Sequence, residues 1–325
     1  MTSVLVLGGT GWLSAHVARE WIGAAASVTC LARGGRPAPH GAELVVADRA
    51  DPDAYAALAD EDWDEVVDIS SDPAFVASAV AALADRAAHW TYVSSLSVYA
   101  DSDVESADES ATLLDPARPG DEYDYGRAKV AAEASVRAAL GDRAAIVRPG
   151  LIVGPGDPSD RFGYWVSRFA EAGDGPVLTP ETQGRSAQII DVRDLAAFLV
   201  ELGEEGWTGV VNAIGDPMPL GDLLADARAA AGHTGEVVSA DDTWLLAHDV
   251  QHWMGARSLP LWLPADMHGF SNRANVVYRN ANGSFRPLAE TLADTLADER
   301  ERGLERERRA GLSREDELAL IAAAQ

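Results

Sequence analysis

Short apolar runs of Val, Ile and Leu alternate with alanine-rich stretches through the first half of the chain. The apolar runs predict strands at 3–7, 27–32, 43–47, 65–69, 90–94 and 144–148. The stretches between them predict helices near 11–23, 52–60, 73–87 and 123–140. Because strands and helices alternate, we predict an α/β domain built on a Rossmann-type, doubly wound parallel sheet.

The alternation breaks after Pro155, where GPGDPSDRFG predicts a loop that leaves the sheet. Short strands around one helix return over 187–215, and from Pro217 the composition shifts to helices, tryptophans and prolines. We therefore predict a smaller, mostly helical substrate lobe that is interleaved with the Rossmann domain. The expected boundaries are 1–155 (completed by 187–215) for the Rossmann domain, 156–186 and 216–288 for the lobe, and 289–325 for a C-terminal helical tail.

A glycine-rich turn follows the first predicted strand, in VLVLGGTGWLSAHVA. Gly8 and Gly11 permit a tight turn and a close approach of the backbone to a pyrophosphate, which a helix N-terminus attracts. Ser14 stands where a third glycine usually allows close packing of helix and strand, and its small size makes this a mild departure. The cofactor contacts expected at this turn are Gly8, Thr10, Gly11, Trp12 and Leu13.

Tyr125 and Lys129, in YGRAK, are four residues apart and so lie on one helix face. A phenol has a pKa of roughly 10, and a nearby ammonium would lower it enough for Tyr125 to exchange a proton with a carbonyl or an alcohol. The run HWTYVSSLSVYA ends a predicted strand in hydroxyls, so Ser95 is the expected partner of Tyr125, with Ser94 as the second choice. The alternatives are a surface tyrosine and two serines that cap a strand.

These motifs, in this order, resemble the extended short-chain dehydrogenase/reductases of the NAD-dependent epimerase/dehydratase family. The resemblance continues through VRPGLIVGPGDP and IIDVRDLAAFL, and is weakest from Gly221 to Met267. The YWVSRF segment and the Arg-rich tail are similar to a bacterial branch described only as reductases. The resemblance implies a nicotinamide cofactor, a catalytic role for Ser95, Tyr125 and Lys129, and a cofactor contact by Lys129.

The second predicted strand ends in CLARGGRP, without the carboxylate that holds the ribose hydroxyls of NAD. Arg33 and Arg36 there would suit the 2′-phosphate of NADP, so NADP is predicted, with NAD as the alternative. Two exposed loop arginines would give the same pattern. By resemblance, Asp48 is an expected adenine contact and Ser70 lies near the cofactor ribose.

Residues next to these motifs limit the reactions that the protein can be expected to catalyse. Leu96 and Ser97 follow Ser95 where the family's sugar dehydratases carry an Asp-Glu pair, which disfavours dehydration. Arg185 is two residues from the place where nucleotide-sugar epimerases commonly carry a phosphate-binding arginine. We predict an oxidoreductase that interconverts a ketone and a secondary alcohol on a sugar-like or natural-product substrate. An NAD-dependent sugar epimerase is the alternative, and a non-catalytic NADP-sensing protein is a further one.

The substrate pocket is expected beside Tyr125, under the 157–188 segment and the lobe. Its predicted contacts, besides Ser95, are Arg161, Tyr164, Trp165 and Gln188. Arg161 would bind a carboxylate or phosphate, or else form a structural salt bridge. Tryptophans 244, 253 and 262 would fill the lobe core, or one of them would face the pocket and stack on a ring.

Composition limits the partners. A net charge of −26 disfavours nucleic acid and anionic membranes, and no apolar run is long enough for a membrane helix. The single cysteine, Cys30, is expected inside a strand, and together with the lack of a signal peptide it predicts a cytoplasmic protein. Histidines 248, 252 and 268 form no convincing metal site. A small-molecule substrate is expected and, by resemblance, a homodimer.

Overall fold

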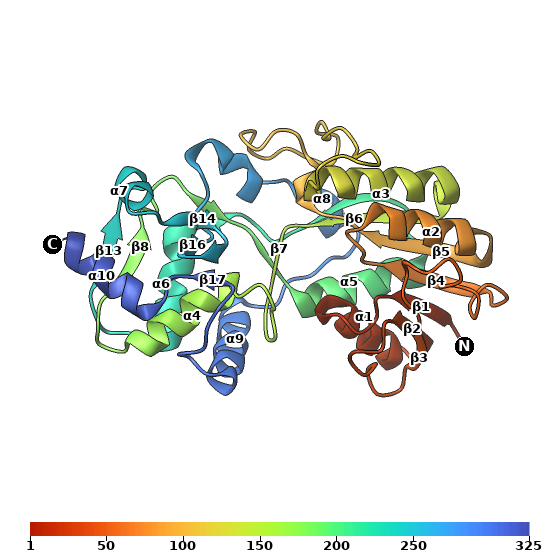
Figure 1. The fold of residues 1–325 in the computed structure, drawn as a ribbon, viewed down its shortest axis with the longest axis horizontal. Helices are drawn as coiled ribbons and strands as arrows, with labels where there is room; N and C mark the ends of the chain where they lie inside the picture. Colours follow the sequence, from red (N-terminus) through yellow and green to blue (C-terminus); the bar gives the residue numbers. More distant parts are fainter. Residues whose placement is uncertain (325) are drawn as a thin grey trace.

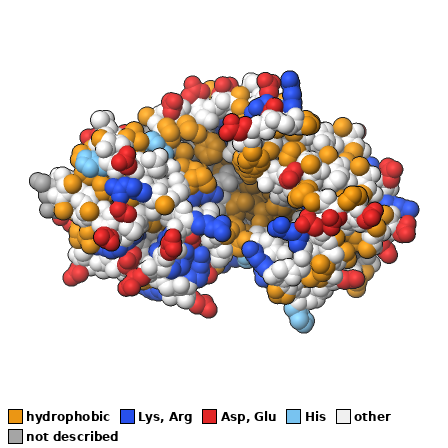
Figure 2. All heavy atoms as spheres, in the orientation of Figure 1, with side chains coloured by type: hydrophobic (Ala, Val, Ile, Leu, Met, Phe, Trp, Pro, Cys, Tyr) orange, Lys and Arg blue, Asp and Glu red, His pale blue; other side chains and the backbone are white. Residues whose placement is uncertain are grey.

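The protein, represented by a computed structural model that describes residues 1–324, has two halves separated by a hollow (Figures 1 and 2). The first half contains a seven-stranded sheet in the order β11-β6-β5-β4-β1-β2-β3, and every pairing in it is parallel. This topology confirms the doubly wound sheet. Its strands are β1 (Ser3–Leu7), β2 (Ser27–Ala32), β3 (Glu43–Val46), β4 (Trp63–Asp68), β5 (Ala87–Val93), β6 (Ala144–Pro149) and β11 (Gly209–Ala213).

Helices cover both faces of this sheet. One face carries α1 (Trp12–Gly23) and α5 (Val192–Glu205), and the other carries α2 (Pro73–Leu83) and α3 (Tyr125–Leu140) (Figure 1). Strand β1 supplies both layers, because Val4 and Val6 belong to the core under α1 and α5 whereas Leu5 and Leu7 belong to the opposite core. A strand buried on both faces is apolar at every position, as the sequence pattern indicated.

The helix predicted at 52–60 is wrong. Residues 51–60 form successive turns in which Ala54 N–H donates to Asp51 and Leu58 N–H donates to Tyr55, each three residues back. The tighter turns carry buried Tyr55 and Leu58 onto the sheet, and the Arg49 guanidinium fixes the Tyr55 hydroxyl at 2.9 Å. Contacts with distant residues therefore determine the conformation of this segment, although its local sequence also suits a helix.

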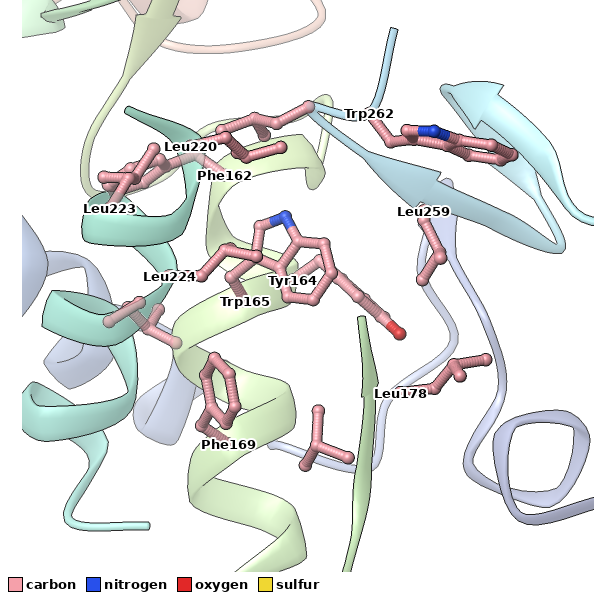
Figure 3. Close-up of a cluster of buried hydrophobic side chains, with 14 of the residues drawn as sticks. Phe162, Tyr164, Trp165, Phe169, Leu178, Leu220, Leu223, Leu224, Leu259 and Trp262 are labelled. Atoms are coloured by element: carbon pink, nitrogen blue, oxygen red, sulfur yellow. The ribbon is translucent and has the colours of Figure 1, made fainter. Parts of the chain in front are cut away.

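The second half is a lobe around one hydrophobic core (Figure 3). Two pairs of short strands lie in the connections to the first half: β7 (Leu151–Val153) with β10 (Ile189–Asp191), and β9 (Ser186–Ala187) with β12 (Met218–Pro219). Two further pairs accompany the helices of the lobe: β8 (Val177–Pro180) with β13 (Val237–Ala240), and β14 (Gln251–Trp253) with β16 (Ser258–Pro260). The helices are α4 (Arg161–Ala172), α6 (Leu220–Ala231), α7 (Asp242–Ala247), α9 (Leu288–Arg302) and α10 (Arg314–Ala324).

The C-terminal segment is part of this lobe instead of a separate tail. Leu292, Leu296 and Leu320 lie in the lobe core, and β17 (Ala310–Gly311) pairs with β15 (Gly255–Ala256). The chain just before this C-terminal segment packs on the Rossmann domain. There α8 (Val276–Asn280) contacts the Rossmann core through Tyr278, whose ring centroid lies 4.3 Å from that of Phe198. No helix within residues 1–324 is both long and apolar enough to cross a bilayer.

Candidate active site

The glycine turn between β1 and α1 is built for close backbone approach. Gly8 has φ of +79°, and its carbonyl accepts hydrogen bonds from the Gly11 amide at 3.0 Å and from the Ser14 hydroxyl at 2.6 Å. A Cβ atom on Gly9 would lie 2.5 Å from Cys30 Sγ, so the turn packs directly against β2. Ser14 thus ties the helix to the turn at the position where a third glycine was expected.

A cleft of about 800 Å³ opens in front of this turn, along the carboxyl ends of β1 to β4. Its lining includes nine residues predicted as cofactor contacts: Gly8, Thr10, Gly11, Trp12, Leu13, Arg33, Arg36, Asp48 and Ser70. Trp12 closes one end, because its Nε1 donates to the Pro155 carbonyl at 2.8 Å. A cleft at the carboxyl edge of a parallel sheet, in front of a glycine turn and a helix N-terminus, suits a dinucleotide.

The arginines of this cleft differ in what they contact. Arg33 and Arg36 are exposed, and neither side chain forms a hydrogen bond or ion pair with residues 1–324. Arg49, which was not predicted, makes a bidentate ion pair with buried Asp68 at 2.8 and 2.7 Å and also donates to the Phe75 carbonyl. Arg49 is therefore a structural cation, whereas the other two remain available to a ligand.

Tyr125 and Ser95 come from two segments in close contact. Tyr125 begins α3, after Asp124 caps the helix by accepting from the Arg127 amide at 2.8 Å. The next residue, Gly126, has room for no side chain because the Ser97 carbonyl lies against it. Ser95 accepts from the Ser97 amide at 3.1 Å and so caps the short 3₁₀ helix Leu96–Val98.

The pKa of Tyr125 reflects three neighbours. Burial raises the pKa above its ordinary value and the Tyr123 phenol adds to this, while the Ser95 hydroxyl, by hydrogen bonding, and the positive charge of Arg161 lower it by less. The predicted cation, Lys129, instead points its Nζ at the carbonyls of Ser70 and Val93, at 2.9 and 2.7 Å. Among the described residues the ammonium of Lys129 is thus engaged by backbone carbonyls, and its effect on Tyr125 stays a prediction.

Lys129 links α3 to the cleft in front of the glycine turn. Its ammonium is buried, lies 4.9 Å from the centroid of the Tyr92 ring, and bonds the carbonyl of Ser70, whose residue lines the cleft. Burial lowers the pKa of Lys129 to about 7, against the opposing charges of Asp68 and Glu133. Its proton is thus held loosely enough to be lost near neutral pH.

Ser94, the second choice for the catalytic hydroxyl, has a structural role. Its Oγ donates to Glu133 Oε1 at 2.6 Å, inside the protein. Glu133 also accepts two bonds from buried Arg148, at 2.9 and 2.7 Å, and Arg148 donates to the Tyr99 hydroxyl at 2.9 Å. This buried network braces α3 one turn after Lys129, and the sequence did not reveal it because its members are far apart in the chain.

Two of the predicted substrate contacts are core residues. Tyr164 and Trp165 are buried in the lobe, where Figure 3 shows them among Phe169, Leu224 and Leu259. Trp165 Nε1 donates to the Pro260 carbonyl at 2.9 Å. The structure therefore gives these two side chains a packing role in place of the predicted contact with substrate, because the α4 face that carries them points into the lobe.

Gln188 and Arg161 have different positions. The buried Gln188 amide is fully engaged, since it donates to the carbonyls of Gly215 and Arg273 and accepts from the Arg273 amide. Arg161 lies at the start of α4, half-buried, with its guanidinium 5.0 Å from the centroid of the Trp253 ring. Gln188 is thus fully engaged within the protein, whereas Arg161 keeps terminal nitrogens without an acceptor among residues 1–324.

A narrow pocket between the two halves contains one of the three candidate tryptophans, Trp253, and an aromatic residue that was not predicted, Phe270. Leu96, Gln188, Trp253, Leu261 and Phe270 contribute to its walls, and Figure 2 shows hydrophobic side chains deep in the hollow between the halves. Trp253 and Leu261 have φ of +67° and +69°, conformations that are costly for large side chains and that occur mostly at functional sites. The three tryptophans of the lobe could not be separated by sequence alone.

The other aromatic and histidine side chains of the lobe are structural. Trp262 is buried and donates to Asp242 at 2.9 Å, while the His252 ring packs on it with centroids 3.8 Å apart. His248 stacks on Trp244 at 3.9 Å. Within residues 1–324 no group of three or more His, Cys, Asp or Glu side chains is placed to hold a metal ion.

Comparisons with known proteins agree with this geometry. Residues 4–215 match the family described as NAD dependent epimerase/dehydratase. No curated protein matches the chain. Among solved structures, a protein from Burkholderia cenocepacia J2315 with a provisional epimerase name is 23% identical, with a TM-score of 0.72 over 92% of this chain and 98% of that one.

Two further structures are similar in fold. UDP-N-acetylglucosamine 4-epimerase from Bacillus cereus is 15% identical, with a TM-score of 0.68 over 96% of this chain and 100% of that one. UDP-glucuronic acid 4-epimerase from Bacillus cereus, solved in complex with NAD, is 14% identical, with a TM-score of 0.66 over 92% of this chain and 99% of that one. At these identities the likeness shows the fold alone.

Proposed function

The chain belongs to the NAD dependent epimerase/dehydratase family, and from that premise we propose that it is an NADP(H)-dependent oxidoreductase that interconverts a ketone and a secondary alcohol. The nicotinamide cofactor would occupy the cleft at the glycine turn and supply or accept the hydride. The backbone at Gly8 and Gly11 would hold its pyrophosphate, and Lys129 and Ser70 lie where the cleft meets the catalytic helix.

The protein side chains handle the proton. Tyr125 would donate it to the carbonyl oxygen during reduction and remove it from the hydroxyl during oxidation. Ser95, whose segment packs against the start of α3, would hydrogen-bond the same oxygen and hold it beside the phenol. Arg161 would favour the phenolate that forms when the proton leaves, because its positive charge already lowers the pKa of Tyr125.

The choice of NADP rests on one observation at the end of β2. The strand ends at Ala32, and the guanidiniums of Arg33 and Arg36 follow it into the cleft without a partner among residues 1–324. A carboxylate that could hold the ribose diol of NAD is lacking there. Two free forked donors suit a 2′-phosphate better than a neutral hydroxyl.

A nucleotide-sugar epimerase that uses NAD is the second candidate, because the similar structures include several enzymes of that kind. Arg185, the residue that could have held the diphosphate of such a substrate, is already bonded to other groups of the protein. Arg185 forms an ion pair with Asp242 at 2.5 Å and also donates to the Leu263 carbonyl. These contacts favour a substrate without a nucleoside diphosphate.

Replacement of Tyr125 tests the proposal. Tyr125→Phe should abolish ketone reduction by NADPH across a panel of ketones that the wild-type protein reduces, while NADPH binding, followed by fluorescence, stays within about twofold. Tyr123→Phe is the matched control, because Tyr123 is 68% exposed beside the same helix. Unchanged turnover in Tyr125→Phe would refute the catalytic assignment. A wild-type protein that binds NADPH but reduces no member of a broad panel would support the non-catalytic sensing alternative.

A further inference from the structure

We propose that the substrate carries an anionic group, a carboxylate or a phosphate, and that Arg161 binds it beside the reacting carbon. This inference rests on the proposed oxidoreductase function, because it places the anion in the same pocket as Tyr125 and Ser95. It makes Arg161 the residue that sets substrate class.

Arg161 is a lobe cation without a counter-ion. Its Nε donates to Ser159 Oγ at 3.2 Å, but within residues 1–324 its two terminal nitrogens have no hydrogen-bond acceptor and no carboxylate within ion-pair distance. Two other arginines of the lobe are paired, Arg168 with Glu317 at 3.2 Å and Arg257 with Asp316 at 2.5 Å, whereas Arg228 and buried Arg273 form no ion pair within residues 1–324. A half-buried guanidinium is costly to leave unpaired, which indicates that its partner is a ligand.

The nearest acidic side chains are occupied by other groups. Asp157 accepts from both the amide and the hydroxyl of Ser159, each at 2.8 Å. Asp160 accepts from Arg302 at 3.1 Å, from Arg306, and from the Arg309 amide at 2.9 Å. Asp160 is thus neutralised by other cations, whereas Asp157 bonds only neutral donors and its charge acts on Arg161 without forming an ion pair with it.

The same contacts fix the position of Arg161. Asp160 is the N-cap residue of α4, makes no capping hydrogen bond through its side chain, and has φ of +61°, a left-handed conformation that glycine, asparagine and aspartate adopt more readily than other residues. Arg302, at the end of α9, and Arg306, after it, hold Asp160 in place, so the first residue of α4 leaves the turn in a set direction. A position fixed by a surrounding ion-pair network is typical of a preorganised binding residue.

The wall beside Arg161 completes the pocket. Its guanidinium lies over Trp253, whose ring meets Phe270 edge-on with centroids 5.7 Å apart, and both aromatic residues line the narrow pocket with Leu96, the residue after Ser95. Arg161 thus adjoins this pocket through Trp253, and Ser95 adjoins it as the residue before Leu96. In a chain with a net charge of −26, such a local cation is needed if an anion is to bind.

Matched acids and esters test this inference on the full chain with saturating NADP. The probes are benzoylformate, acetoacetate and galacturonate, each beside its methyl ester, with binding followed by calorimetry. At least one acid should bind about 10- to 100-fold more tightly than its ester, the range expected for charge-assisted hydrogen bonds. Arg161→Gln should remove that preference, Arg161→Lys should keep part of it, and Arg257→Gln, which alters a paired lobe arginine, should leave it unchanged.

The outcomes separate this inference from the proposed function. Equal binding of acid and ester for all three pairs, or an acid preference that survives in Arg161→Gln, would overturn the role of Arg161. Arg161→Lys guards against a fold defect, because it keeps the charge and the side-chain length. An Arg161-dependent acid preference in a wild-type protein that reduces no ketone of a broad panel would support the anion site and count against the oxidoreductase.

Discussion

Loss of the Glu133 charge should destabilise the protein severely, because Glu133 is the anion at the centre of a buried network. It is 1% exposed and accepts two bonds from Arg148, which is equally buried, and one from Ser94. Burial disfavours the charged carboxylate, but the Arg148 hydrogen bonds outweigh burial and the pKa of Glu133 is lowered. Glu133→Gln keeps the shape of the side chain and leaves the Arg148 charge without compensation.

The expected cost follows from these contacts. Breaking a buried ion pair by removing one partner costs about 3–5 kcal/mol, most of it from the stranded charge. The Tyr99 hydroxyl still accepts from Arg148, and the new amide oxygen can still accept from Ser94, so we expect the lower end of that range, about 3 kcal/mol. Arg137→Gln removes a partner of Glu133 whose side chain is 45% exposed, and should cost no more than about 0.5 kcal/mol.

Urea denaturation of the two variants and the wild type measures this effect. A double variant, Glu133→Gln with Arg148→Met, should recover part of the loss because it removes the stranded charge as well. The negative charge of Glu133 also raises the pKa of Lys129, which is about 7 in the folded protein, so its removal should shift the pH profile of activity toward lower pH. A loss below about 1 kcal/mol in Glu133→Gln would refute the argument from burial.

Three further predictions concern the cofactor and pH. The double variant Arg33→Ala with Arg36→Ala should weaken NADPH binding about 10- to 100-fold and leave NADH binding within about twofold. This range for the loss of NADPH affinity already allows for the solvent exposure of both side chains, and Arg19→Ala is the control. Equal losses for both nucleotides would refute the 2′-phosphate assignment. Because the pKa of Lys129 is lowered from 10.5 to about 7, Lys129→Met should stabilise the fold most below about pH 7, and the gain in urea denaturation should vanish toward about pH 10.5. Burial alone would lower the pKa of His89, but the buried Glu65 carboxylate raises that pKa above 6.5. The stability that the charged His89 contributes is therefore complete at about pH 5 and is lost as pH rises through the pKa of the folded protein. A difference in stability between wild type and His89→Gln that does not change with pH would contradict this.

Sequence reasoning worked best where local pattern and tertiary role coincide. The apolar runs of the sheet are buried on both faces, so strand positions and the parallel order followed from alternation with helices. The glycine turn was equally readable, because Gly8 and Gly9 are required by a positive φ and by the approach of Cys30. Nine predicted cofactor contacts accordingly lie around one cleft.

The failures share a cause in long-range packing. The segment 51–60 has helical composition, but Tyr55 and Leu58 had to reach the sheet, and this selected successive turns. Tyr164 and Trp165 follow Arg161 directly in the chain, yet their direction depends on which face of α4 meets the lobe. The structural role of Arg49 could not be predicted, because its ion-pair partner Asp68 is 19 positions away in the chain.

The nucleotide that the purified protein carries tests the central claim most directly. The protein should be denatured after purification, its nucleotides identified by chromatography, and NADPH and NADH titrated separately into a second sample. We predict a site that exchanges its cofactor and takes up NADPH in preference to NADH, as a net oxidoreductase with Arg33 and Arg36 on a 2′-phosphate requires. Tightly held NAD⁺ at close to one equivalent would contradict the account and favour an epimerase that regenerates its own cofactor.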